Sequence, residues 1–230
     1  MHVTAIVLAA GKGVRLKNRI PKPLVEINSC PLIIYCLDIL SSQPDIKEII
    51  VVANPENLEY IRQNLRQYRI AKVKDIVLGG RLRQESVVKG LKAMDTCTDW
   101  VLIHDGVRPF IDKGIVSSVI KAARKYKAAI VGVPVKGTIK SSGRKCIVKR
   151  TLDRKNLWEI QTPQVFKKDL ILKAYKKFGN TEVTDDASLV ERLGVKVKIV
   201  MGSYFNIKIT TPEDLVLAEA INGISHRYRL

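Results

Sequence analysis

Small and cationic residues directly follow the first apolar segment of the chain, which spans residues 3–9. The set consists of Ala9, Ala10, Gly11, Gly13, Arg15 and Lys22. Small residues let backbone N–H groups come close to a phosphate, and cationic side chains add positive charge. The spacing of the glycines matches neither the P-loop motif nor the dinucleotide-binding motif. The segment therefore indicates either a phosphate site or only a tight turn between a strand and a helix.

A second segment places a carboxylate and a cation at the end of another apolar run. It contains Asp105 and Arg108, with Gly106 between them. A lone Asp at the end of a strand can hold Mg²⁺, because this ion takes one or two carboxylates and otherwise phosphate or water oxygens. The alternative is an Asp-Gly turn in which Arg108 pairs with Asp105. We interpret the neighbouring His104 as structural.

Two later segments contain polar residues that could cap helices. Residues 184–188 read Thr-Asp-Asp-Ala-Ser, and a Thr or Asp before an apolar helix is an ordinary N-cap. Thr211 is likewise a candidate N-cap, with Pro212 in the first turn of its helix. Capping leaves Lys208 unexplained, so Lys208 stays a candidate for chemistry.

The spacing of apolar residues predicts the elements that position these segments. Strands are expected over residues 3–9, 48–53, 74–78, 100–104, 128–133 and 195–200. Helices are expected over residues 31–40, 55–67, 84–94, 113–126, 168–178, 186–193 and 212–222, with Asn54 as N-cap of the second. This alternation predicts an α/β fold with a doubly wound, mostly parallel sheet covered by helices on both faces. Ligands bind beyond the carboxyl ends of such strands, which selects residues 9–15, 79–86 and 104–109.

One stretch departs from the alternation of strands and helices. Residues 135–157 are polar and basic, and the Ser-Ser-Gly sequence at 141–143 signals a turn. We expect a β-hairpin arm here, projecting from a single domain that spans residues 1–230. The apolar residues of such an arm need a partner, and a second subunit would supply one.

The composition limits the classes of function. The 230 residues include 40 Lys and Arg against 22 Asp and Glu, a formal net charge of +18. This charge fits a basic surface, a nucleic-acid partner or a phosphate-rich substrate, but no nucleic-acid-binding motif is recognisable. No stretch approaches the roughly 20 apolar residues of a membrane span, and no secretory leader is evident. The four cysteines lack C-x-x-C spacing and only three His are present, so we expect no zinc site and reduced thiols in a cytoplasmic protein.

Eight short segments, taken in order along nearly the whole chain, resemble the 2-C-methyl-D-erythritol 4-phosphate cytidylyltransferase family of the non-mevalonate isoprenoid pathway. The segments are Ala9-Ala10-Gly11-x-Gly13-x-Arg15, Pro21-Lys22, Gly79-Gly80-x-x-Arg83-x-x-Ser86-Val87, His104-Asp105-x-x-Arg108-Pro109, Asp153-Arg154-x-x-Leu157-Trp158, Thr162-Pro163-Gln164, Thr184-Asp185-x-Ala187-Ser188 and Asn206-Ile207-Lys208. Each segment alone is common, but eight in register are specific. The resemblance implies the nucleotide-diphospho-sugar transferase fold.

The resemblance also implies a reaction, in which CTP and 2-C-methyl-D-erythritol 4-phosphate give 4-diphosphocytidyl-2-C-methyl-D-erythritol and pyrophosphate. The catalytic residues that it implies are Arg15, Lys22 and Lys208. The nucleotide-binding residues that it implies are Ala9, Ala10, Gly11, Gly13, Gly80, Arg83 and Ser86. The acceptor-binding residues that it implies are Arg108 and Thr162, with Thr138 and Arg154 from the arm of a second subunit in a homodimer. Asp105 would hold Mg²⁺ or another divalent cation.

Three residues depart from the pattern of that family. Pro23 stands where Gln is usual, Arg81 where an acid often follows the glycine pair, and Gly137 where Asp usually precedes the Thr. Residues 21–24 are more typical of sugar-1-phosphate nucleotidylyltransferases, and residues 105–110 match pentitol-phosphate cytidylyltransferases, which act on ribitol 5-phosphate. Both enzymes remain alternatives, as does a basic nucleic-acid-binding protein without enzymatic activity.

The implied reaction needs cations rather than a proton-transfer group. A phosphomonoester is largely dianionic near pH 7, because its second pKa is about 6, so it can attack the α-phosphorus of CTP without a general base. The obstacle is to bring two polyanions together and to neutralise charge in the transition state. The scarcity of histidine fits this hypothesis.

Overall fold

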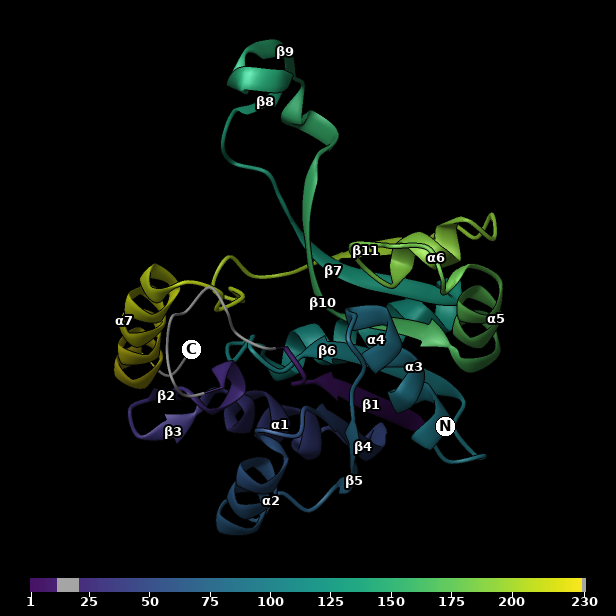
Figure 1. Cartoon of the computed structure of the whole chain (residues 1–230), viewed down its shortest axis with the longest axis vertical. Coiled ribbons are helices and arrows are strands. Elements are labelled where there is room, and N and C mark those ends of the chain that lie inside the picture. Colours follow the sequence, from purple (N-terminus) through teal and green to yellow (C-terminus); the bar gives the residue numbers. More distant parts are fainter. Residues whose placement is uncertain (12–20, 229–230) are drawn as a thin grey trace.

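The computed structural model describes residues 1–11 and 21–228, except for the side chains of Lys22 and of residues 224–228. In this part of the chain, seven strands form a central sheet (Figure 1). The strands are β1 (Val3–Leu8), β4 (Ile46–Ala53), β5 (Val73–Leu78), β6 (Trp100–Asp105), β7 (Ala128–Pro134), β10 (Trp158–Lys167) and β11 (Lys198–Met201). Their order is β11-β7-β10-β6-β1-β4-β5, and β10 runs antiparallel to both of its neighbours. The other neighbouring strands are parallel, which confirms the predicted doubly wound, mostly parallel sheet.

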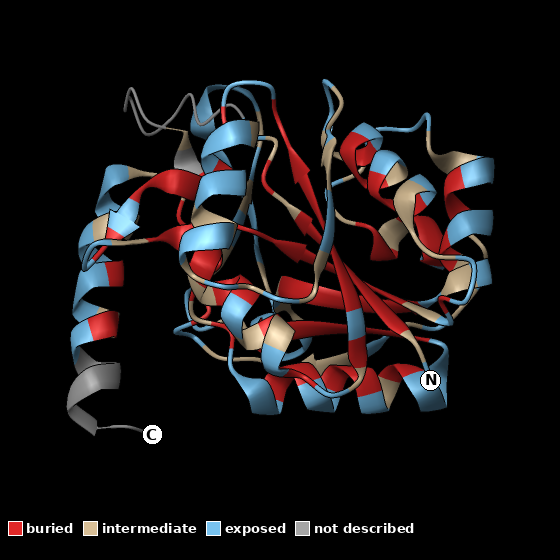
Figure 2. Ribbon diagram, turned by 90° about the horizontal axis from the view of Figure 1, so that it is seen from below, coloured by how far each residue is buried: buried red, intermediate tan, exposed pale blue. Residues whose placement is uncertain are grey.

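The central strands are buried on both faces, as strands of a helix-covered parallel sheet must be. In β1, Val3, Ala5 and Val7 pack on one face of the sheet, whereas Ile6 packs on the other. Buried residues concentrate on the strands and on the inward sides of the helices (Figure 2).

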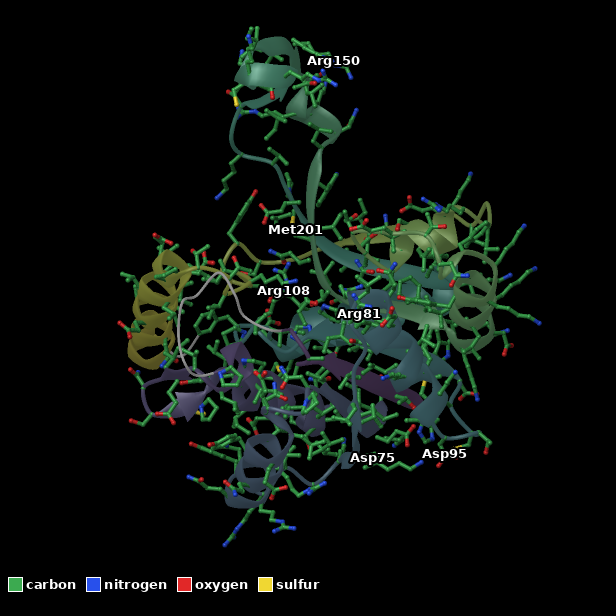
Figure 3. The ribbon with its side chains drawn as sticks, viewed as in Figure 1. Asp75, Arg81, Asp95, Arg108, Arg150 and Met201 are labelled. Atoms are coloured by element: carbon green, nitrogen blue, oxygen red, sulfur yellow. The ribbon has the colours of Figure 1, made fainter. Side chains whose placement is uncertain are left out.

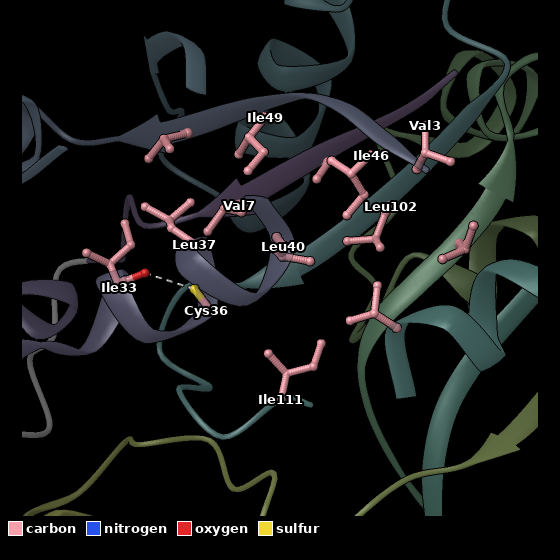
Figure 4. Packing of buried hydrophobic residues seen from close by; sticks show 14 of the residues in the cluster. Val3, Val7, Ile33, Cys36, Leu37, Leu40, Ile46, Ile49, Leu102 and Ile111 are labelled. Atoms are coloured by element: carbon pink, nitrogen blue, oxygen red, sulfur yellow. Dashed lines mark hydrogen bonds between the residues drawn. The ribbon is translucent and has the colours of Figure 1, made fainter. Parts of the chain in front are cut away.

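Helices cover both faces of the sheet. On one face lie α1 (Leu32–Ser42), α2 (Leu58–Gln67) and α4 (Lys113–Tyr126), which pack on the cluster seen in Figure 4. On the other face lie α3 (Arg83–Ala93), α5 (Lys168–Phe178) and α6 (Ala187–Glu191). The last helix, α7 (Pro212–Tyr228), packs beside the small hairpin of β2 (Glu26–Ile27) and β3 (Cys30–Pro31), which follows the short 3-10 helix η2 (Lys22–Leu24). None of the described helices has the length and apolar character that crossing a membrane requires.

The predicted arm is a β-hairpin that projects from the body of the molecule (Figure 1). Its strands are β8 (Ile139–Ser142) and β9 (Val148–Leu152), and two short 3-10 helices, η3 (Arg144–Cys146) and η4 (Arg154–Asn156), interrupt it. Ile147 and Val148 near its tip are 67% and 56% exposed. The arm begins at the end of β7 and returns through β10, so both of its ends are anchored in the central sheet.

The structure corrects several expectations. No strand was expected over residues 158–167, yet β10 lies between β6 and β7. Its polar residues and Pro163 are not typical of a central strand, because proline cannot donate a hydrogen bond to a sheet ladder. The chain accommodates this proline with a register shift between Gln161 and Gln164. The second helix begins at Leu58 rather than at residue 55, and its N-cap is Asn57 rather than Asn54.

Candidate active site

The carboxyl ends of β1, β5 and β6 bring three of the selected segments together around one cavity of about 790 Å³. Its lining includes many of the residues that sequence analysis singled out: Ala9, Ala10, Gly11, Gly80, Arg83, Ser86, Asp105 and Lys208. The rule that ligands bind at the carboxyl edge of a parallel sheet therefore selected segments that line a common cavity.

Two asparagines hold the first of these segments in place. Asn57 donates from Nδ2 to the carbonyl oxygen of Ala9 at 2.8 Å, and Asn54 donates to that of Ala10 at 3.5 Å. Each asparagine also accepts a hydrogen bond from the backbone N–H of the other, at 2.9 Å. The sequence indicates Asn54 only as a helix cap and carries no signal for Asn57. The two side chains instead fix the backbone that lines the cavity.

The glycine pair after β5 allows a second backbone segment to approach the first. A Cβ atom on Gly79 would lie 2.5 Å from Cβ of Ala10 and 2.8 Å from Oγ of Ser86, so no larger residue fits. Ser86 accepts from the N–H of Gly80 at 3.1 Å and donates to the carbonyl oxygen of Leu82 at 3.2 Å. Ser86 thus lines the cavity and also locks the turn that forms its wall.

Asp105 lies at the centre of a cluster of three cations. Its Oδ2 is 2.9 Å from Nζ of Lys208 and 3.5 Å from Nε of Arg108, while its Oδ1 is 3.8 Å from Nε of Arg83. Burial on its own would raise the pKa of Asp105, but Lys208, Arg83 and Arg108 together hold it well below its usual range. Asp105 is therefore a carboxylate anion at neutral pH. The pairing of Arg108 with Asp105, which was the alternative to a metal site at this segment, is present within a larger cluster.

A second cavity of about 510 Å³ opens on the other side of this cluster. Arg83, Asp105 and Lys208 line both cavities, and Arg108 and Thr162 line only the second. Arg108 is 7% exposed and donates to the carbonyl oxygen of Asn206 at 2.8 Å, yet its Nε makes no hydrogen bond. This Nε is itself buried and faces Asp105, so what Arg108 offers to an anion in the cavity is the positive charge of its guanidinium. Figure 3 shows Arg108 and Arg81 in the body of the molecule, far from Arg150 on the arm.

A chain of hydrogen bonds fixes the segment that carries Asp105 and Arg108. Thr162 accepts from the N–H of Asp105 and is bonded to Nδ1 of His104, each at 3.0 Å. Nε2 of His104 lies 3.2 Å from the carbonyl oxygen of Arg108. Because a carbonyl only accepts, Nε2 must carry the proton, and Nδ1 then accepts from the Thr162 hydroxyl. The register shift in β10 places this hydroxyl at the end of β6, as bulges often do beside active sites.

His104 is therefore a neutral structural residue, as expected from the sequence. It is fully buried, and burial lowers its pKa to about 4 despite the opposing effect of Asp105. With both ring nitrogens engaged, it has no free position for proton transfer.

Asn206 positions the segment that carries Lys208. Its Nδ2 donates to Oε1 of Gln161 at 3.2 Å and to the carbonyl oxygen of Thr162 at 3.0 Å. Farther along this segment, Ile209 donates its N–H to the carbonyl oxygen of Val107 at 2.9 Å. Lys208 is thus held beside Asp105 by contacts on both sides, and sequence spacing alone gives no signal for them.

The comparison with known proteins matches this geometry to one family. Residues 3–223 match the family described as 2-C-methyl-D-erythritol 4-phosphate cytidylyltransferase. A protein of that name from Caldanaerobacter subterraneus subsp. tengcongensis is 48% identical over 95% of this chain and 98% of its own length. The chain belongs to this family. A relative of the same name from Syntrophus aciditrophicus is 46% identical over 95% of this chain and 94% of its own.

Solved structures of this cytidylyltransferase family have the same fold. The 4-diphosphocytidyl-2C-methyl-D-erythritol synthase from Anaerococcus prevotii matches with a TM-score of 0.85 and 37% identity, over 96% of each chain. The cytidylyltransferase from Thermus thermophilus matches with a TM-score of 0.77 and 31% identity, over 96% of this chain and 98% of its own. These matches confirm the family resemblance found in the sequence and do not favour the pentitol-phosphate, sugar-1-phosphate or nucleic-acid-binding alternatives.

Two residues that the cytidylyltransferase resemblance singled out lie on the arm, away from both cavities, and three others cannot be placed. Thr138 and Arg154 belong to the arm, where Arg154 donates to the carbonyl oxygen of Lys136. Gly13 and Arg15 lie outside the described residues, as does the side chain of Lys22. The roles of all five stay predictions.

Membership of the cytidylyltransferase family raises the question of a divalent cation at Asp105. Among the described residues, no group of three or more His, Cys, Asp or Glu side chains could enclose a metal ion. Asp105 supplies a single carboxylate, which suffices for Mg²⁺ when phosphates supply further oxygens. Lys208 and Arg108 already pair with this carboxylate. The residues therefore fit a cation that arrives with a polyphosphate, rather than a metal site complete in the protein alone.

Proposed function

We propose that this chain transfers the cytidylyl group of CTP to 2-C-methyl-D-erythritol 4-phosphate, giving 4-diphosphocytidyl-2-C-methyl-D-erythritol and pyrophosphate. The chain is a nucleotidyltransferase by family. The structural observation that supports the reaction is the meeting of two cavities at Asp105, where Arg83 and Lys208 line both. Two anionic substrates could lie on either side of this cation cluster with their reacting phosphates side by side.

The larger cavity is the one that we assign to CTP. Its walls are the backbone of residues 9–11 and the glycine pair, and exposed backbone at such turns can approach a base or a phosphate closely. Arg83 lies where this cavity meets the second one. We assign the triphosphate to this region, with Arg15 and Lys22 as further ligands of its oxygens. Ala9, Ala10, Gly80 and Ser86 would surround the cytosine.

The smaller cavity is the one that we assign to the acceptor phosphate. Arg108 lines this cavity with a buried guanidinium, and Lys208 adds a cation at the junction with the CTP cavity. Thr162 reaches the same cavity, but its hydroxyl already takes part in two hydrogen bonds. We therefore assign Thr162 chiefly to positioning the Asp105 segment.

The chemistry follows from the charges. The acceptor phosphate is largely dianionic near pH 7, so one of its oxygens attacks the α-phosphorus of CTP in line with the departing pyrophosphate. No general base is required, which agrees with the neutral and fully bonded His104. Lys208, Arg108 and Arg83 lower the barrier by neutralising the charge that gathers around the reacting phosphorus. Asp105 keeps these three cations together in the free protein.

A divalent cation such as Mg²⁺ would be held by Asp105 together with triphosphate oxygens. When bound, it supplies additional charge neutralisation at the phosphates. Lys208 lies on the same carboxylate oxygen as Arg108, so Lys208 is placed to turn from Asp105 to a phosphate when a cation occupies the carboxylate. The protein alone would then bind Mg²⁺ weakly, and CTP would be needed for tight binding.

We also propose that the arm joins two copies of the chain. Exposed Ile147 and Val148 near its tip offer apolar area that a second subunit could cover. Thr138 and Arg154 would then reach the acceptor site of that subunit. All four cysteines are free thiols, in keeping with the cytoplasmic location that we propose.

The decisive experiment is a panel of nucleotides and acceptors. CTP, UTP and GTP would each be paired with 2-C-methyl-D-erythritol 4-phosphate, ribitol 5-phosphate and glucose 1-phosphate, and pyrophosphate release measured with Mg²⁺ present. We expect turnover to be highest by far for CTP with the methylerythritol phosphate. Preference for ribitol 5-phosphate, or for UTP with glucose 1-phosphate, would overturn the proposal.

A further inference from the structure

Arg83 lies between two carboxylates of different character. Its NH2 group is 2.7 Å from Oδ2 of Asp186, whereas its Nε is 3.8 Å from Oδ1 of Asp105. The first ion pair is short and the second is loose. Asp186 thus holds the NH2 group of this guanidinium, while its Nε faces Asp105 at the junction of the two cavities.

The adjacent residues Asp185 and Asp186 make different contacts at the start of α6. Asp185 accepts a hydrogen bond from the N–H of Ser188 at 3.1 Å, which is the capping role expected for this segment. Asp186 makes no capping bond with its side chain and turns toward Arg83 instead. Capping of α6 therefore accounts for Asp185 but leaves the side chain of Asp186 to another role.

Asp186 is a buried anion with one strong partner on each oxygen. It is 0% exposed, and Tyr175 donates its hydroxyl to Oδ1 at 2.5 Å while Arg83 donates to Oδ2. Burial, and next the negative charge of Asp186, raise the pKa of Tyr175, so its hydroxyl keeps the proton that it donates. A buried carboxylate with this geometry constrains its cation, because moving the guanidinium away would leave a buried charge without a compensating partner.

We propose that Asp186 is a positioning residue which, supported by Tyr175, holds the guanidinium of Arg83 at the junction of the two cavities, where it meets a substrate phosphate. This inference rests on the cytidylyl transfer proposed above. Asp186 itself does not line either cavity, so it acts only through Arg83. A displacement of the guanidinium by about 1 Å would be costly, because catalytic contacts of this kind can lose on the order of 100-fold in rate when misplaced.

Steady-state kinetics of matched variants test the inference. Asp186→Asn keeps the shape and can still accept hydrogen bonds, but it removes the charge that anchors Arg83. We expect kcat/KM to fall by about 10- to 100-fold and Asp186→Glu to recover most of it. Because Asp186 acts through Arg83, the double variant Arg83→Met/Asp186→Asn should lose no more activity than Arg83→Met alone.

Glu48 provides the matched control. It is another buried carboxylate, 5% exposed and bonded to Thr4 and Lys74, but it lines neither cavity. Glu48→Gln should lower the melting temperature and leave kcat/KM unchanged. The inference is overturned if Asp186→Asn stays within about threefold of the wild type, or if the losses of Asp186→Asn and Arg83→Met simply multiply in the double variant.

A readout without turnover separates this inference from the proposed function. In ¹⁵N–¹H NMR spectra, an anchored guanidinium gives an N–H signal protected from exchange with water, which Arg83→Met would assign by its loss. We expect Asp186→Asn to abolish this signal and Asp186→Glu to restore it. If the wild-type protein showed the signal but transferred no cytidylyl group, the proposed function would fail while the anchoring stood. If Asp186→Asn left the signal intact, the anchoring would fail whatever the activity.

Discussion

Nζ of Lys208 lies 2.9 Å from Oδ2 of Asp105, and this ion pair closes the cation cluster between the two cavities. Asp105 is 6% exposed, whereas the side chain of Lys208 is 40% exposed. The aspartate is therefore the fixed partner, and the lysine is the one free to exchange it for a phosphate.

The first prediction concerns Lys208 itself. Lys208→Ala should lower kcat by about 100- to 1,000-fold, because it removes a charge that stabilises the transition state, while the fold persists. Pyrophosphate release and circular dichroism measure the two effects. Lys176→Ala, a change of an exposed lysine on α5, serves as the control and should retain full activity. Near-wild-type turnover in Lys208→Ala would contradict the assigned mechanism.

The second prediction concerns the cation at Asp105. Asp105→Asn should abolish most Mg²⁺-dependent turnover, and calorimetry should show tight Mg²⁺ binding to the wild type only when CTP is present. Full activity of the variant, or tight Mg²⁺ binding without nucleotide, would refute this assignment.

The pH dependence of stability gives an independent test of Asp105. Because its folded pKa is lowered, it stabilises the protein above its unfolded pKa of about 3.9, and this contribution is lost as the pH falls toward the folded value. The difference in unfolding free energy between the wild type and Asp105→Asn should therefore be largest near neutrality and shrink below about pH 4. Urea unfolding at several pH values measures it, and a difference that did not change with pH would show that Asp105 is not the buried anion described.

His104 should affect stability in a different pH range. Its pKa of about 4 lies below the ordinary value, so between about pH 6.5 and pH 4 the unfolded chain binds a proton that the folded protein does not. Stability should fall through this window by about 3 kcal/mol more in the wild type than in His104→Gln. An equal slope in both proteins would mean that His104 already takes up protons in the folded state.

Thr162 should act through position rather than through direct contact. Thr162→Ser retains the hydroxyl that links Asp105 to His104, so its kcat/KM should stay within a few-fold of the wild type. Thr162→Val keeps the volume but leaves a buried N–H and a ring nitrogen unpaired, at a cost of about 1–3 kcal/mol in stability. We expect at least about a tenfold loss of kcat/KM as well, because the Asp105 segment loses its anchor. Equal activity of the two variants would exclude this role.

The arm can be tested by removing it. Replacing residues 139–152 with a short Gly-Ser turn should leave the body folded, because this hairpin packs in its own two-stranded sheet. Sedimentation velocity should then show a monomer, where the wild type is expected to be a dimer, and activity should fall because Arg154 no longer reaches a second subunit. A wild type that is monomeric at micromolar concentration would rule out shared sites.

The sequence predicted helices best where the periodicity of apolar residues is clear. Helices α4 and α5 have the predicted bounds, and Asp112 caps α4 by accepting from the N–H of Ile115. The sequence did not predict β10, because Pro163 and its polar neighbours are not typical of a strand. Several of these polar side chains instead face the candidate site. These polar residues are buried but make hydrogen bonds instead of apolar contacts, as Thr162 does with Asp105 and Gln164 with Asp185.

The candidate site was predictable only in part. The strand-edge rule brings Gly80 near Asp105, but no pattern in the sequence places Asp186 behind Arg83 or Asn57 behind Ala9. Such contacts depend on how separate elements pack, so the spacing of residues along the sequence cannot predict them. Asp186 was interpreted as part of a helix cap because a capping aspartate and a buried ionic anchor look alike in sequence.

The antiparallel strand β10 connects the arm directly to the candidate active site. The arm leaves the body from β7 and returns directly into β10, which carries Thr162 to the end of β6. The strand that leads out of the arm is thus the same strand whose Thr162 hydroxyl accepts a hydrogen bond from the N–H of Asp105. A partner that fixes the position of the arm therefore also fixes the start of the strand that holds the Asp105 segment.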